Sequence, residues 1–247
     1  MELSAAGLAK HTPPSKDTKD IRQVLKEGFV CHVAYIDPTS TPNRPLAVPM
    51  VYGYKEGKDP ELGTLYVHGA KDHPKYPNPS RLHVLASRSG KEGVPVCLTV
   101  TLLDSLIIGR SPYHNSVGYR SVVVKGTAYA IEEKEVCDAL KTLVDHVVPG
   151  SWETARKPNE YEVEGDSKNP DNYPGTVVLR LGLDTPAEVT FKARTGGPKS
   201  EEKVDVDSDY WAGTLPITEV YGPPSPASNL KSGIKTPDYL TKYSRKG

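Results

Sequence analysis

The stretch that decides the fold is "PVCLTVTLLDSLIIGRSPYHNSVGYRSVVVKGTA", residues 95–128. Both of its ends are rich in β-branched residues, which favour strands, and its middle is a polar turn that contains an aromatic side chain. The pattern predicts two strands over 94–111 with a turn near Asp104, and a further strand over 121–131. Residues 112–118 are then expected to form a rim at the entrance of that last strand.

Strand-like segments also flank this stretch on both sides. They are rich in β-branched and aromatic residues, and they span 29–37, 45–54, 63–70, 175–183, 187–195 and 209–222. Helices are expected over 20–28, 80–90 and 132–148. Because the strands follow one another instead of alternating with helices, their order predicts a mainly β (α+β) fold, in which antiparallel strands form a barrel with a few flanking helices.

The two ends of the chain differ in composition from its centre. Polar residues and adjacent prolines predict a flexible N-terminal arm over 1–19, and a segment rich in Pro, Ser and Lys predicts an extended tail over 223–247. A single domain is expected over 20–222. Within it, Pro49 predicts that the strand over 45–54 lies at an edge or is partly unpaired, because proline has no backbone N–H to donate.

Charge and cysteine content restrict the function and the compartment. Lys and Arg together number 31, as do Asp and Glu, so the formal net charge of zero argues against nucleic-acid binding. Cys31, Cys97 and Cys137 lie far apart in apolar runs, which predicts buried, inert thiols, although a Cys–His nucleophile pair stays open. Without a secretory signal or a membrane-spanning run, we expect a soluble cytoplasmic protein with no membrane partner.

Most motifs that carry chemistry are missing. The sequence has no GxGxxG, no Walker A loop, no HExxH and no GxSxG. His68, His73 and His83 are close in sequence but have no carboxylate at a metal-ligand spacing, so no metal site is expected. His68 ends a predicted strand, where it either binds a ligand or is a rim residue. Trp211 either stacks on a ligand or packs at an interface.

Two basic features are candidates for an anion site. Ser80 and Arg81 begin a predicted helix, whose free N–H groups favour a phosphate, but they read equally as an N-cap beside a surface arginine. Arg120 and Lys125 lie five residues apart on one predicted strand, so they point to opposite faces. For Lys125 we favour a solvent-facing position.

Together these segments resemble the pyridoxamine 5′-phosphate oxidase-like FMN-binding split barrels, and among them the flavin-nucleotide-binding branch that includes nitroimidazole-resistance proteins. The resemblance covers about residues 20–222, and its most specific motif is the stretch 95–128. Its other motifs are "LYVHGA" (65–70), "SRL" (80–82), "LVDHVVPGSW" (143–152) and "DYWAGTLP" (209–216).

The resemblance implies an FMN bound in a groove at the interface of a homodimer. By their match to the family's motifs, the cofactor-binding residues are Val48, Pro49, Met50, Val51, Tyr66, Val67, His68, Ser80, Arg81, Tyr119, Arg120, Ser121 and Trp211. Two departures stand out: Leu82 replaces a lysine of the family's phosphate clamp, and residues 71–79 lengthen the loop before it.

The resemblance implies a flavin-dependent oxidoreductase that acts on a small organic molecule. The chain lacks the arginine-rich C-terminal signature of true pyridoxamine phosphate oxidases, so vitamin B6 oxidation is not expected. One alternative is a non-catalytic protein that binds flavin or haem, with His68 as an axial ligand. Another is a nitroreductase of the nitroimidazole type. No residue identifies itself as a catalytic acid or base.

Overall fold

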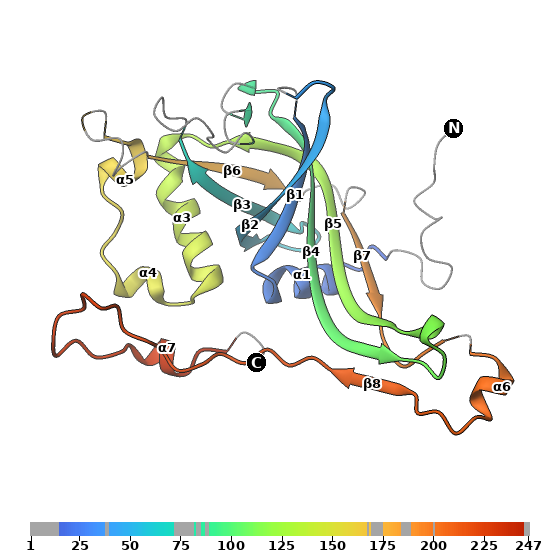
Figure 1. Ribbon diagram of the computed structural model, residues 1–247. Coiled ribbons are helices and arrows are strands. Elements are labelled where there is room, and N and C mark those ends of the chain that lie inside the picture. Colours follow the sequence, from blue (N-terminus) through green and yellow to red (C-terminus); the bar gives the residue numbers. More distant parts are fainter. Residues whose placement is uncertain are drawn as a thin grey trace.

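The stretch 95–128 forms the two longest strands of the protein, β4 (Val94–Ile108) and β5 (Ser116–Ala130), which pair antiparallel around the short helical turn η2 (Pro112–His114) (Figure 1). The predicted turn near Asp104 is wrong, because β4 continues through that residue as one strand. A register shift between Leu103 and Ser105 marks a bulge instead. A bulge bends a strand without ending it, so it accommodates the polar residue within the hairpin.

The other strands complete a barrel. They are β1 (Val30–Asp37), β2 (Arg44–Glu56), β3 (Gly63–Ala70), β6 (Thr176–Gly182), β7 (Val189–Arg194) and β8 (Gly213–Pro216). The sheet order is β7-β5-β6-β3-β2-β1-β4-β8, and the additional β4–β5 pairing closes the strands from β5 to β4 into a ring. Every pairing is antiparallel, which confirms the predicted fold class. The computed structural model describes residues 15–37, 40–71, 82, 85–86, 89–166, 168, 175–183, 189–199 and 201–244.

Strand β2 changes partner along its length. Its first part pairs with β1 from Arg44 to Val51, and its second part pairs with β3 from Tyr52 to Glu56. In the described part of the chain, the first part therefore has a strand neighbour on one side only. Pro49 lies in this part, opposite His32 of β1, which agrees with the edge position that its missing N–H predicts.

The core fills the inside of the barrel and extends under helix α1 (Thr18–Glu27). Alternate residues of each strand point inward, as Val96, Leu98 and Val100 do on β4. Helix α1 begins at Thr18, two residues inside the expected N-terminal arm, because Asp17 caps it by accepting hydrogen bonds from the backbone N–H groups of Lys19 and Asp20. The helix expected over 80–90 lies largely outside the described residues.

Helix α3 (Glu133–Val147) covers the outside of the barrel beside β2, β3 and β6, and it confirms the helix predicted over 132–148. Val136, Ala139 and Leu143 form its buried stripe. Gly53 of β2 lets the helix approach closely, since a side chain there would meet the backbone of Leu143 at 2.7 Å. Two short helices follow, α4 (Ser151–Thr154) and α5 (Glu160–Glu164).

The C-terminal region leaves the barrel. After the short helix α6 (Lys203–Val206), strand β8 pairs with the far end of β4, and the chain then runs back below the barrel (Figure 1). Residues 218–238 of this segment are all exposed. Its end, helix α7 (Asp238–Thr241), docks beside α4, where Thr154 Oγ1 donates a hydrogen bond to Tyr239 Oη at 3.1 Å.

Candidate functional site on the outer face of the barrel

The outer face of β2, β1, β4 and β5, called the flat face below, carries mainly short side chains. One row across the four strands, set by direct pairing, consists of Pro49, His32, Thr99 and Val123. The next row, two residues along each strand, consists of Ala47, Ala34, Cys97 and Lys125. Side chains of this size leave room for a planar group to lie across the strands.

One end of this face is hollowed into a groove of about 810 Å³. The groove is mainly apolar, and its lining comes from β1, β2, β4, β5 and β6: Ala34, Tyr35, Ile36, Pro45, Pro95, Val96, Cys97, Lys125, Gly126, Thr127, Tyr129 and Gly182. Lys125 is exposed and supplies the positive charge among these residues. An apolar groove of this size with a single cation suits a planar organic ligand that carries negative charge or strong acceptors.

The four predicted residues of β2 divide between the two sides of the barrel wall. Pro49 and Val51 are exposed on the outer face, whereas Val48 and Met50 are half-buried and pack against the core. Alternation along a strand requires this division. Only Pro49 and Val51 therefore present their side chains to a ligand on the outer face, and Val48 and Met50 contribute backbone.

The three predicted residues of β3 do not converge on one point. Val67 is part of the core, and Tyr66 packs against the cluster of apolar side chains under α3. His68 is exposed at the end of β3. Desolvation by the neighbouring protein nevertheless lowers the pKa of its imidazole below the ordinary value, so the ring is neutral at pH 7.

The predicted phosphate clamp is only partly visible. Ser80 and Arg81 lie outside the described residues, so their role stays a prediction. Leu82, which replaces the family's lysine, is 1% exposed and belongs to the core. At this position a lysine ammonium would be buried among apolar side chains, where an unpaired charge is costly. Leucine at this position therefore suits the core of this chain.

Arg120 is held by two carboxylates. Its Nε and Nη2 donate to Asp104 at 3.0 and 2.9 Å, and its Nη1 lies 2.8 Å from Glu27 Oε2 at the end of α1. These hydrogen bonds raise the pKa of the guanidinium above its ordinary value. A flavin phosphate at Arg120 would have to replace one of these carboxylates, so the structure gives this arginine a structural role.

The neighbours of Arg120 on β5 lie on the outer face. Tyr119 and Ser121 are half-buried and have the same parity as Val123 and Lys125. Ser121 Oγ donates to the backbone oxygen of Lys192 at 3.4 Å. Arg120 therefore points to the opposite side of the sheet from Tyr119 and Ser121, although all three were expected to face one cofactor.

Trp211 lies far from this face within one chain. It precedes β8 at the far end of the β4–β5 hairpin, where its ring closes on Gly213, and its side chain is 66% exposed. The structure therefore does not bring Trp211 together with Pro49 or His68 in the same subunit.

The outer face includes residues that sequence reasoning missed or set aside. His32, Thr99 and Cys97 were not predicted as site residues, and Lys125 was assigned to solvent. Strict alternation from the buried residues Val33 and Leu98 was the signal that identifies this face. Pairing of the four strands, which sets the rows, is not encoded in any local pattern.

The thiols confirm the prediction of inert cysteines only in part. Burial raises the pKa of Cys31 to about 12, which makes it unreactive. Cys97 is half-buried in the groove, and Cys137 is exposed on α3, so the expectation that they are buried is wrong. Cys97 and Cys137 each lie on the outward-facing side of their strand or helix. The apolar residues around them in the sequence do not reveal this orientation.

Among the described residues, no group of three or more His, Cys, Asp or Glu side chains is placed to hold a metal ion. In the same part of the chain, no helix is long and apolar enough to cross a membrane.

Comparison with known proteins identifies solved structures that have a similar fold. The chain superimposes on a protein from Mycobacterium smegmatis described as an FAD and heme binding protein, with a TM-score of 0.73 and 24% identity over 93% of this chain and 98% of that chain. It also superimposes on the flavocytochrome Anf3 from Azotobacter vinelandii, with a TM-score of 0.70 and 25% identity over 94% of this chain and 92% of that chain. A search of curated proteins finds no match.

The sequence profile of the pyridoxamine 5′-phosphate oxidase family matches residues 17–169, which include strands β1 to β5 and helix α3. The chain therefore belongs to the pyridoxamine 5′-phosphate oxidase family. This confirms the family resemblance inferred from the stretch 95–128 and its neighbours.

Proposed function

We propose that this protein binds a flavin, FMN, on the outer face of β2, β1, β4 and β5, and that it is a flavin-dependent oxidoreductase for a small organic molecule. The observation that carries the proposal is the flat face of small side chains beside the 810 Å³ groove, in a chain that belongs to this family. The names of the two superimposed proteins support a flavin as the ligand.

The residues of the face fit the planar part of a flavin. Ala34, Ala47 and Thr99 leave the surface open, and Pro49 and Val51 add apolar contact. Lys125 gives the groove a positive charge that suits the anionic parts of the cofactor. When bound, a flavin supplies the electron or hydride transfer, and these residues orient it and exclude water from one side.

The proposal includes a homodimer, because the face is open in a single chain. The exposed apolar residues on the outer side of β1, β2 and β4 are Val30, Ile36, Val51, Leu103 and Leu106. Exposed apolar groups on adjacent strands are typical of surfaces that another protein covers. A second copy would cover this face and would also bring its own Trp211 toward the cofactor, which one chain alone does not do.

A second candidate is a protein that also binds haem, with His68 as the axial ligand. The specific observation is that desolvation keeps this exposed imidazole neutral at pH 7, and a neutral ring nitrogen is what iron requires. The names of both superimposed proteins include haem or a cytochrome. Addition of haem, read by the Soret band in the wild type and in His68→Ala, tests this candidate.

The flavin proposal is tested by the visible spectrum of the purified protein and by titration with FMN. We expect saturable binding that Thr99→Trp weakens at least tenfold, since an indole in the centre of the face blocks the ring. Lys55→Trp, at an exposed position on the far part of β2, is the matched control and should bind FMN normally. A colourless protein with no saturable binding, or equal affinity in Thr99→Trp, would overturn the proposal. Reduction of a nitroimidazole by the loaded protein tests the nitroreductase alternative.

A further inference from the structure

A second hollow lies beside the groove, over the pairing of β5 with β6. Its volume is about 460 Å³, and its described lining consists of Ala86, Gly90, Lys91, Tyr129, Ala130 and Arg180. Tyr129 lines both the hollow and the groove, so its ring separates them. The two alanines and Gly90 leave the floor of the hollow open because they are small. Lys91 and Arg180 are the charged residues of the described lining.

Strand register fixes the position of Arg180. On β6 it lies directly opposite Tyr66 of β3 on one side and Tyr129 of β5 on the other. Directly opposite residues have Cβ atoms about 4.5–5.5 Å apart, so the arginine lies between two phenol side chains. Burial raises the pKa of Tyr66, and the charge of Arg180 opposes that rise, which is consistent with their proximity.

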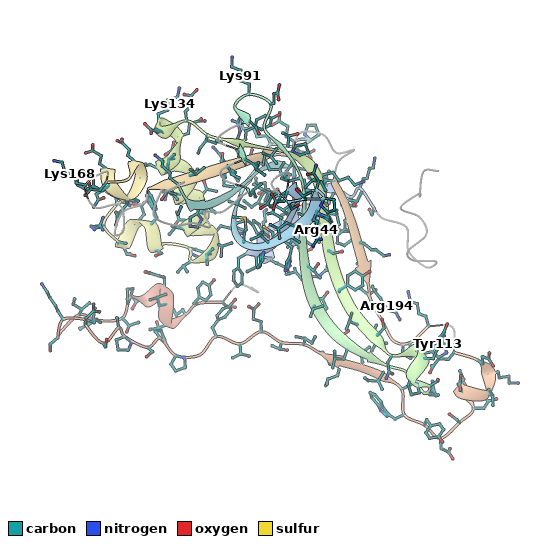
Figure 2. All side chains as sticks on the ribbon, turned by 45° about the horizontal axis from the view of Figure 1, so that its top comes forward. Arg44, Lys91, Tyr113, Lys134, Lys168 and Arg194 are labelled. Atoms are coloured by element: carbon teal, nitrogen blue, oxygen red, sulfur yellow. The ribbon has the colours of Figure 1, made fainter. Side chains whose placement is uncertain are left out.

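The turn before β4, in which Gly93 has a positive φ, contacts the ring of Tyr129 and contains Lys91. Gly93 has a φ of +65°, and a side chain there would meet the Tyr129 ring at 2.7 Å, so the ring lies close to this turn. Lys91 lies in the same turn, between Gly93 and Gly90. Figure 2 shows Lys91 at the end of the molecule opposite Tyr113, which marks the hairpin tip.

The hollow has an excess of positive charge. Within the described residues, no carboxylate forms an ion pair with Lys91 or Arg180, and none lines the hollow. Glu92 follows Lys91 in the turn but does not line the hollow, and the charges of Glu135 and Asp138 on α3 act on Tyr66. Two unpaired cations that share one hollow repel each other, so an anion between them would be stabilised.

We propose that this hollow is a binding site for a phosphate or diphosphate group, held by Arg180 and Lys91, in a ligand whose ring packs on Tyr129. Arginine binds phosphate oxygens through two parallel N–H bonds, and lysine adds a mobile point charge. A volume of 460 Å³ accommodates a phosphate with an attached ring. The site goes beyond the proposed function, because its two cations, Lys91 and Arg180, lie outside both the flat face and the groove, and it shares only Tyr129 with the groove.

The test uses inorganic diphosphate as the probe, with calorimetry at low salt on the full chain. We expect saturable binding of one diphosphate per chain, weakened about tenfold to hundredfold in Arg180→Gln and several-fold in Lys91→Gln, as the loss of charged hydrogen bonds implies. Lys134→Gln is the matched control. This exposed lysine pairs with Glu132 and does not line the hollow, so its loss should leave the affinity unchanged.

Two further titrations identify the source of the phosphate. If Arg180→Gln weakens FMN but not riboflavin, the hollow holds the phosphate of the cofactor. If it weakens diphosphate alone, the hollow serves a separate phosphorylated ligand. Either result supports the site. Wild-type protein that does not bind diphosphate saturably, or an Arg180→Gln/Lys91→Gln double variant that melts normally and binds it like wild type, would overturn the proposal whether or not flavin binds.

Discussion

The two halves of the β4–β5 hairpin are held in different ways. In the half near the barrel, from Val94 to Val100, every second residue of β4 is buried in the core. Beyond the bulge at Asp104, Ile107 is the buried residue of β4, and it is not part of the main core. The outer half relies on backbone pairing with β8 and on the ion pair of Arg110 with Glu201, at 2.8 Å.

This difference suggests that the inner half of the hairpin contributes to the stability of one chain and the outer half to assembly. The half near the barrel buries its apolar residues inside one chain, so it contributes to folding. The outer half leaves Leu103, Leu106, Val117 and Leu215 between 37% and 59% exposed. A strand pair with one apolar face open is not explained by the fold of a single chain, but a second copy that covers it would explain it.

The largest expected effect is the loss of a core side chain near the barrel. Leu98→Ala should lower the free energy of unfolding by about 2–5 kcal/mol, because it leaves a cavity inside the barrel beside Val33 and Leu65. Leu106→Ala, the matched change in the outer half, should cost less than about 0.5 kcal/mol at concentrations where the protein is monomeric. Urea unfolding measures both, and equal costs would show that the two halves do not differ.

The next effect is at the bulge where the halves meet. Arg120→Gln removes a side chain that bridges Asp104 and Glu27, so it should lower the free energy of unfolding by about 1–3 kcal/mol, with partial exposure favouring the lower value. Lys125→Gln on the opposite face is the control, with an expected change within about 0.5 kcal/mol. An unchanged unfolding midpoint in Arg120→Gln would contradict this role.

A smaller effect concerns assembly through the outer half. Leu106→Asp places a charge on the exposed apolar surface and should weaken dimerisation at least tenfold, about 1.4 kcal/mol, while the monomer stays folded. Tyr161→Asp, on exposed helix α5, should leave the dimer unchanged. Analytical ultracentrifugation over a range of concentrations separates the two, and a dimer that ignores Leu106→Asp would place the interface elsewhere.

The smallest effect is a pH dependence of the free energy of unfolding, which arises from His68 on β3 of the barrel. The pKa of His68 is lowered in the folded state, so the unfolded chain binds more protons between the folded pKa and about 6.5. Stability should therefore fall as the pH drops through this window and stay constant above it. His68→Gln should reduce the fall, and unfolding curves from pH 5 to 7.5 measure it. A fall of the same size in the variant would assign it to other groups.

Much of the fold was predictable from local pattern. The apolar stripe of α3 through Val136 and Leu143, and the β-branched runs of β1, β5 and β6, identify their elements because burial imposes a period on the sequence. The pattern failed at Asp104, which reads as a turn residue. A bulge and the ion pair with Arg120 keep it inside a strand, and neither device is local in sequence.

The candidate site was less predictable. The family motifs pointed to β2 and β5, which form part of the candidate face, but the direction of each side chain depends on register and parity. These put Arg120 on the side of α1, and Val67 in the core. The partner of Arg120 on α1, Glu27, lies too far away in sequence to be paired with it by inspection. Likewise, Lys91 and Arg180 line one hollow because β5 pairs with β4 on one side and with β6 on the other.

The central claim is that the outer face binds a flavin in a homodimer. Native mass spectrometry of the purified protein after saturation with FMN measures both parts at once. We predict a species of two 26.9 kDa chains with two flavins, in which Leu106→Asp lowers the share of dimer and Thr99→Trp lowers the flavin content per chain. A monomer, or a dimer without flavin at saturating FMN, would contradict the account.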